Sequence, residues 1–198
     1  SAKKVAKLAS RGKGKKIRFA GGTLFPVIIT GIVVVSLALV VYARQTLPAD
    51  GAGNFVLVWD SFGSAGTDRS SFSIQAQRFA ANGAALGAQF QVNTYTTAAQ
   101  RYPSVAVDSA GNFAVVWQSL GSSGTDSDSL SIRGRRFDAN GIPVGGDSQV
   151  NSYTTNSQEL PVVAATGAGD FVVAWQSLGS YGTDSSNSSV QAQRFGCV

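Results

Sequence analysis

One stretch of sequence recurs three times at a fixed spacing, and this repetition limits the fold more than any other feature. GNFVLVW begins at Gly53, GNFAVVW at Gly111 and GDFVVAW at Gly169, so both intervals are 58 residues without an insertion. The loops that follow, GSAGTD, GSSGTD and GSYGTD, keep the same register. A constant period of this length is typical of arrays in which each copy is one supersecondary unit that packs on the next.

The pattern within each copy is that of β-strands joined by turns. The second copy offers four candidate strands, at residues 103–108, 113–119, 131–138 and 147–153, and no helical periodicity competes with them. Four short strands per copy are typical of a β-propeller blade. The first copy lacks a counterpart of the first strand and the third stops just after Phe195, which leaves ten strands. We predict an all-β repeat domain, an incomplete β-propeller of about two and a half four-stranded units, preceded by one transmembrane α-helix.

One Trp and one Phe recur at the same place in every copy, and the pattern predicts a bulky structural anchor for each unit. The alternative is a ring of aromatic side chains around a binding surface. These repeat anchors are Trp59, Trp117, Trp175, Phe79, Phe137 and Phe195.

An uncharged segment precedes the repeats. Residues 25–43 read FPVIITGIVVVSLALVVYA, and about 20 apolar residues in a helix span the roughly 30 Å hydrocarbon core of a bilayer. We therefore divide the chain into a basic tail (residues 1–24), a transmembrane helix (25–43), a linker (44–52) and the repeat domain (53–198).

The charges are divided unequally about this segment. Residues 1–44 hold nine of the 16 Lys and Arg residues and none of the 11 acidic ones. The positive-inside rule places the tail in the cytoplasm and the repeat domain outside it. The high pI belongs to the tail alone, so it does not indicate a nucleic-acid-binding domain. The alternative is a signal peptide cleaved after Val41-Tyr42-Ala43, but the long apolar run and the long basic region favour an uncleaved signal-anchor.

The second copy carries a family resemblance. PSVAVDSAGNFAVVWQS, preceded in the first copy by QVNTYTT and followed by RGRRFDANG, resembles the repeats of large bacterial secreted and surface proteins and the blades of sialidase-type propellers. The Asp-box and arginine triad of sialidases are absent, so the resemblance does not imply sialidase activity. The segment KKIRFAGGTLFPVIITGIVVVSLALVVYARQTLPAD resembles the anchor of small single-pass actinobacterial membrane proteins. Together these resemblances imply a bacterial cell-membrane location, and the change of character at Gly51 also fits a fusion or a fragment.

The composition argues against an enzyme. The chain has no His and a single Cys, Cys197, which removes the commonest general base and any Cys-based zinc site. There is no nucleophile elbow and no phosphate-binding loop. We expect no catalytic residue and no cofactor-binding residue, with a propeller-type glycoside hydrolase relative as the least favoured alternative.

Two loop features remain as candidate sites. Asp126 and Asp128 supply carboxylates at alternate positions, a weak calcium pattern whose alternative is a loop held by side-chain turns. Arg133, Arg135 and Arg136 form the one basic cluster of the repeat domain, either a solvated strand edge or a contact for an anionic glycan. We expect a non-catalytic, membrane-anchored binding or adhesion module with a protein or glycan partner. The alternative is a structural or truncated fragment that only self-associates.

Overall fold

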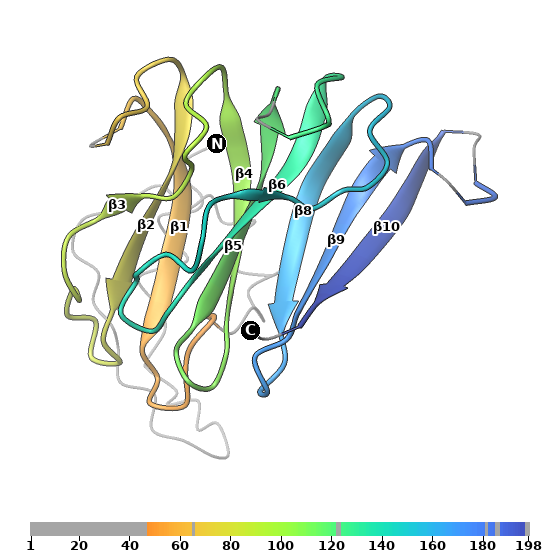
Figure 1. The fold of residues 1–198 in the computed structure, drawn as a ribbon. Helices are drawn as coiled ribbons and strands as arrows, with labels where there is room; N and C mark the ends of the chain where they lie inside the picture. The colour runs from red at the N-terminus through yellow and green to blue at the C-terminus, as the bar shows by residue number, and fades with distance from the viewer. Residues whose placement is uncertain (1–46, 65, 122–123, 181, 185–186, 197–198) are drawn as a thin grey trace, which may run out of the picture. The chain divides into compact units, whose positions relative to one another are not determined.

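The computed structural model describes residues 47–196, apart from 65, 122–123, 181 and 185–186. These residues form ten β-strands (Figure 1), as the sequence predicts. The strands are β1 (Phe55–Phe62), β2 (Phe72–Phe79), β3 (Phe90–Gln91), β4 (Gln100–Val107), β5 (Phe113–Leu120), β6 (Leu130–Phe137), β7 (Ser148–Gln149), β8 (Gln158–Ala165), β9 (Phe171–Leu178) and β10 (Ser188–Phe195).

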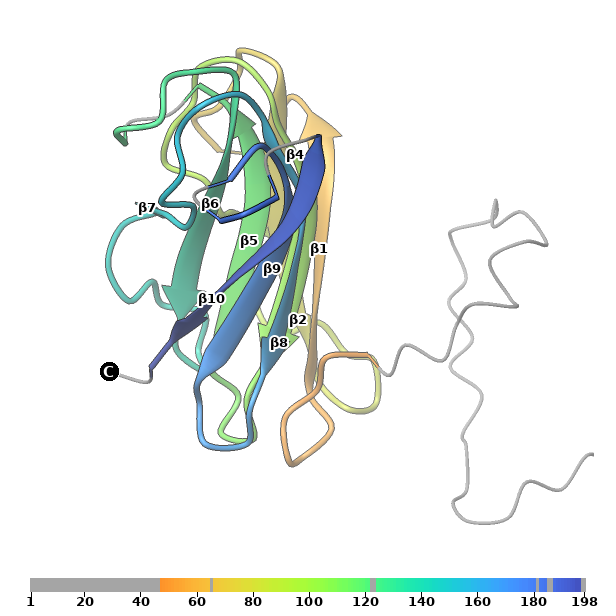
Figure 2. The same ribbon diagram turned by 90° about the vertical axis from the view of Figure 1, so that its right-hand side faces the viewer.

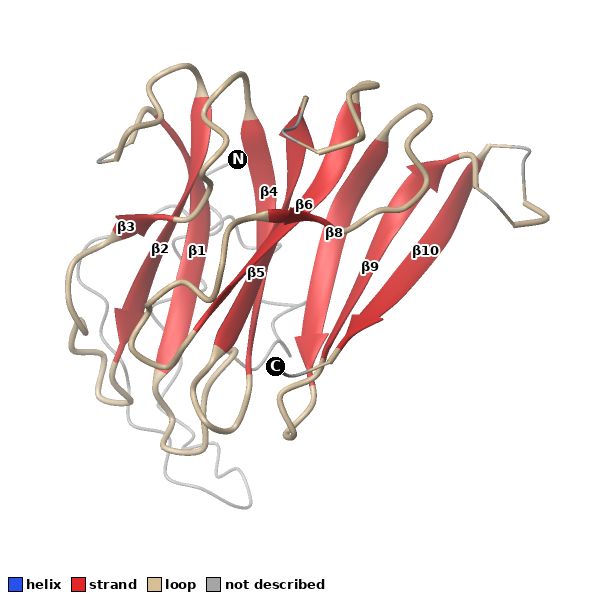
Figure 3. Cartoon of the chain, viewed as in Figure 1, coloured by secondary structure: helices blue, strands red, loops and turns tan. Residues whose placement is uncertain are grey.

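The strands form three antiparallel sheets, one for each copy of the repeat. The first sheet has the order β1-β2-β3, the second β4-β5-β6-β7 and the third β8-β9-β10. No helix occurs in the described part of the chain (Figure 3), and its three sheets do not close a propeller ring. The predicted transmembrane helix at residues 25–43 lies outside the described residues, and within them no helix is long and apolar enough to cross a bilayer.

Neighbouring sheets pack through opposite faces. In β1, β2, β5, β6, β9 and β10, odd-numbered residues lie on one face, here called the odd face, and even-numbered residues lie on the other, the even face. The even face of the first sheet, with Val56 and Ile74, packs on the odd face of the second, with Phe113 and Trp117. The same pairing joins the second sheet to the third. Because each copy repeats both faces, one rule of packing builds the whole array.

The strand boundaries differ from the predicted ones at two places. The predicted fourth strand of the second copy shrinks to the two residues of β7, because it pairs with β6 only through Gln149 and Ser148. The first strand of that copy instead extends back to Gln100, across an irregularity in its pairing with β5 between Arg101 and Ser104. The counterpart of this strand in the first copy would span residues 42–49, of which the structure describes 47–49, and there an isolated bridge joins Ala49 to Phe55.

The hairpin turns are held by aspartate side chains. The carboxylate of Asp108 accepts hydrogen bonds from the backbone amides of Ala110 and Asn112, both at 2.9 Å. Asp138 does the same for Asn140 and Ile142. These contacts agree with the turn-capping role that the spacing of Asp before Gly indicates.

Candidate functional site

A buried polar network occupies the loop end of the second sheet. The side-chain amide of Asn151 donates to the carboxylate of Asp126 at 2.6 Å and to Gln158 at 3.1 Å. Its oxygen accepts from the backbone amide of Ile132 at 2.8 Å. Asn151 therefore links the loop after β5 to β6 and to the start of the third sheet. Its hydrogen bond to Asp126 gives this buried carboxylate a structural role.

The first copy repeats this network at the equivalent residues. Asn93 donates to Asp68 at 2.8 Å and accepts from the backbone amide of Ile74 at 2.9 Å. The equivalent loop carboxylate of the third copy, Asp184, is exposed to solvent.

The two calcium candidates serve different contacts. Asp126 is buried, whereas Asp128 is exposed and accepts a hydrogen bond from the backbone amide of Asn156 at 3.0 Å. No cluster of three or more His, Cys, Asp or Glu residues that could hold a metal occurs in the described part of the chain. Asp126 therefore belongs to the loop network, and the described residues bring no third carboxylate, His or Cys to the pair.

The pKa of Asp126 gives this network a measurable signature. Burial raises the pKa above its ordinary value of 3.8, and hydrogen bonds from Asn151 and from the amide of Asp128 offset only part of the effect. The folded chain then holds this proton more tightly than the unfolded chain. We expect the contribution of Asp126 to stability to fall as pH rises from 3.8 through the raised pKa, and to stay level above it.

Denaturant unfolding of the wild type and of Asp126→Asn, from about pH 3 to about pH 7, measures this contribution. The other carboxylates titrate in both proteins, so their difference isolates Asp126. The wild type should lose stability relative to the variant as the pH rises. A difference that does not change with pH would contradict the raised pKa.

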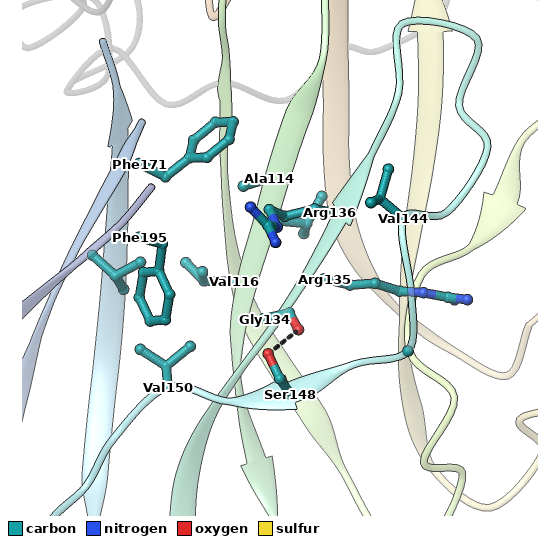
Figure 4. Close-up of a pocket in the computed structure, with 13 residues that line it drawn as sticks. Ala114, Val116, Gly134, Arg135, Arg136, Val144, Ser148, Val150, Phe171 and Phe195 are labelled. Carbon is teal, nitrogen blue, oxygen red and sulfur yellow. Dashed lines mark hydrogen bonds between the residues drawn. The ribbon is translucent and has the colours of Figure 1, made fainter. Parts of the chain in front are cut away.

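The arginine cluster divides into three environments. Arg133 is buried at 3% exposure and donates to the backbone carbonyl of Asp147 at 3.1 Å, so the expectation of a solvated edge is wrong for this residue. Burial lowers the pKa of Arg133. Arg135 donates to the carbonyl of Val92 at 2.8 Å. In Figure 4 its side chain points away from the space between the second and third sheets, whereas that of Arg136 points into it.

This space is a groove of about 250 Å³ between the even face of the second sheet and the odd face of the third. Its walls are mostly apolar, with Val116 and Val150 on one side and Phe171 and Phe195 on the other (Figure 4). Of the two charged residues that line it, Arg135 and Arg136, only Arg136 points its side chain into the space, and no acidic side chain is among the described lining residues. Apolar walls with few polar groups are the usual character of a small-molecule or side-chain binding pocket.

The repeat explains why the groove is open. At the junction of the first and second sheets, Phe90 of β3 packs against Phe137 with the ring centroids 5.5 Å apart. The residue one period later is Ser148, which faces the groove, and Gly134 likewise stands one period after Ala76. The second junction therefore lacks a phenyl ring and a methyl group that the first junction has. A smaller gap lined by other residues is also larger in the second junction, at about 130 Å³ against about 30 Å³ in the first.

The repeat anchors of the second and third copies lie in the interfaces between sheets. Trp117, Phe137 and Trp175 are buried, and Phe113 stacks on Phe137 with centroids 4.8 Å apart. Trp59 is only half-buried, because the odd face of the first sheet has no preceding sheet against it among the described residues. Phe79 and Phe195 are also half-buried, and Phe195 lines the groove.

Sequence reasoning missed the groove. The residues that open it differ from those at the equivalent positions of the first copy, so aligning the copies would have exposed Ser148 as the exception.

Comparison with known proteins adds no relative, because no protein-family model matches the chain and no curated protein matches it significantly. The resemblance to bacterial surface-protein repeats accordingly rests on the motifs alone.

Proposed function

We propose that this chain is a membrane-anchored, extracytoplasmic binding module without catalysis, and that the groove between the second and third sheets captures a protein partner. Residues 25–43 would hold the domain at a bacterial cell membrane with residues 1–24 in the cytoplasm. The observation that carries the proposal is the apolar groove at a junction whose counterpart is filled by Phe90.

The filled junction indicates the chemistry of the ligand. An aromatic ring occupies the first junction, so an aromatic side chain of a partner suits the space beside Ser148 in the second. Arg136 already donates to the carbonyl of Gly196 at 2.9 Å, but a guanidinium has five N–H donors and can bind a carboxylate as well. A partner segment that presents an aromatic residue next to an acidic one therefore fits the groove better than an uncharged sugar.

A small probe with the same two groups tests the proposal. N-acetylphenylalanine carries a phenyl ring and a carboxylate, and it can be titrated calorimetrically into the full chain in lipid nanodiscs. With about 15 non-hydrogen atoms at about 0.3 kcal/mol each, we expect a Kd on the order of 1 mM. N-acetylalanine should not bind measurably, and the amide of N-acetylphenylalanine should bind more weakly because it lacks the charge that Arg136 meets.

Two variants of one residue provide the matched control. Ser148→Phe places the Phe90 side chain in the second junction, so it should abolish binding while raising stability by about 0.5–2 kcal/mol, as cavity-filling changes do. Ser148→Ala removes the same hydroxyl but leaves the groove open, so binding should persist. Equal affinity of wild type and Ser148→Phe would overturn the site. Binding of an anionic oligosaccharide that N-acetylphenylalanine does not displace would favour a glycan partner instead.

A further inference from the structure

The two ends of the described array expose the two halves of one interface. At each internal junction, an even face packs on the odd face of the next sheet. The even face of the third sheet and the odd face of the first sheet take part in neither junction. These are the same two kinds of face that pack together twice within the chain.

The even face of the third sheet exposes large apolar side chains. Val190 is 80% exposed, whereas Ile132 and Ile74, one and two periods earlier, are 0% exposed. Along β9, odd residues such as Val173 are buried while the even residue Val172 is exposed. Along β5, which has a sheet on both sides, both sets are buried. Figure 2 views the molecule from the side of the third sheet, and no strand lies in front of β10.

The odd face of the first sheet is the complementary half. Phe55 stacks on Phe79 with centroids 5.2 Å apart, which repeats the pairing of Phe113 with Phe137. Trp59 on this face is half-buried, while Trp117 in the same position of the second sheet is fully buried. The odd face of the first sheet therefore has the same aromatic arrangement as the odd face of the second sheet, which packs on an even face.

Polar contacts across the junctions point the same way. Arg78 donates to the carbonyl of Asn140 in the following copy at 2.5 Å, and Arg136 donates to the carbonyl of Gly196 at 2.9 Å. The equivalent residue of the third sheet, Arg194, is largely exposed and pairs with Asp170 of its own sheet. The turn at residues 80–83 of a second copy offers Arg194 the backbone carbonyls that its counterparts use.

We infer that two copies of this chain associate head to tail, with the even face of the third sheet of each copy on the odd face of the first sheet of the other. Both contacts are then satisfied in one closed, symmetric dimer. The ring would hold six sheets, within the usual range of about four to eight propeller blades, whereas one copy falls short and three copies exceed it. This inference does not depend on the groove, which lies within one chain.

Light scattering of the full chain in mild detergent, corrected for bound detergent, tests the association. We expect the mass of two copies for the wild type and of one copy for Val190→Glu, because the carboxylate would be buried in the new junction. Ile142→Glu is the matched control, since Ile142 is also exposed but lies in the loop after β6, away from both faces. It should keep the mass of two copies.

A mixture of two variants adds a second readout. Val190→Glu disables the third sheet and Trp59→Glu disables the first, so each variant alone should be monomeric. Mixed in equal amounts, they share one intact contact and should form a detectable fraction of dimer. A wild type that stays monomeric, a continuous series of larger sizes, or a Val190→Glu variant with the mass of the wild type would each overturn the closed dimer.

Discussion

Replacing Trp117 with alanine is expected to lower the free energy of unfolding by about 3–5 kcal/mol, as large-to-small changes at fully buried aromatic residues do. The indole is 0% exposed and lies in the core that joins the first two sheets, with Val56 and Ile74 across the junction. Equilibrium denaturation of the full chain, followed by circular dichroism, measures the loss.

Trp59 is the matched control because it occupies the same position of the first copy. It is only half-buried, so Trp59→Ala should cost roughly half as much or less in the monomer. Trp117→Phe should also be milder, since most of the apolar contact remains and the indole Nε1 has no hydrogen-bond acceptor among the described residues. In the Val190→Glu background, which we expect to be monomeric, equal losses for Trp59→Ala and Trp117→Ala would contradict the packing order of the sheets.

Asn151→Ala is the second change expected to have a large effect. It removes the donor to the buried Asp126 carboxylate and the acceptor of the Ile132 amide. Each buried polar group left unsatisfied costs about 1–3 kcal/mol, and more when it is charged, so the total loss should reach about 3 kcal/mol or more. Thermal and denaturant unfolding of wild type and variant provide the measurement.

Two further variants separate this network from a general effect of losing an asparagine. Asn187→Ala, at an exposed position, should change stability by no more than about 0.5 kcal/mol. The double variant Asp126→Asn with Asn151→Ala should lose less than the sum of the single changes, because the buried charge is gone. Strict additivity would show that the two side chains do not depend on each other.

Much of the fold follows from the sequence because the pattern of each strand occurs in more than one copy of the repeat. The strand with Trp117 and the turn at Asp108 recur at the 58-residue period, so a pattern that arises by chance in one copy is not repeated in the others. The length of β7 could not be predicted, since it depends on how far the edge residues after Gln149 stay paired with β6. Pairing at a sheet edge is decided by tertiary contacts rather than by local preference.

The candidate site was less predictable than the fold. Asp126 looks like a loop ligand in sequence, and its structural role became visible only once Asn151, 25 residues later, was placed beside it. The groove depends on what is missing, a Phe at 148 and a methyl group at 134, and periodic patterns report the residues that recur. A position-by-position comparison of Phe90 with Ser148 is the signal that sequence reasoning could have used.

Methyl-resolved NMR of the full chain in nanodiscs, titrated with N-acetylphenylalanine, tests the binding groove most directly. The account predicts that shifts concentrate on the methyl groups of Val116, Val150 and Val173, which line the groove. It also predicts that Ser148→Phe abolishes these shifts and Ser148→Ala preserves them. Shifts spread over other valines, or an unchanged response of Ser148→Phe, would contradict the claim that this junction is the binding site.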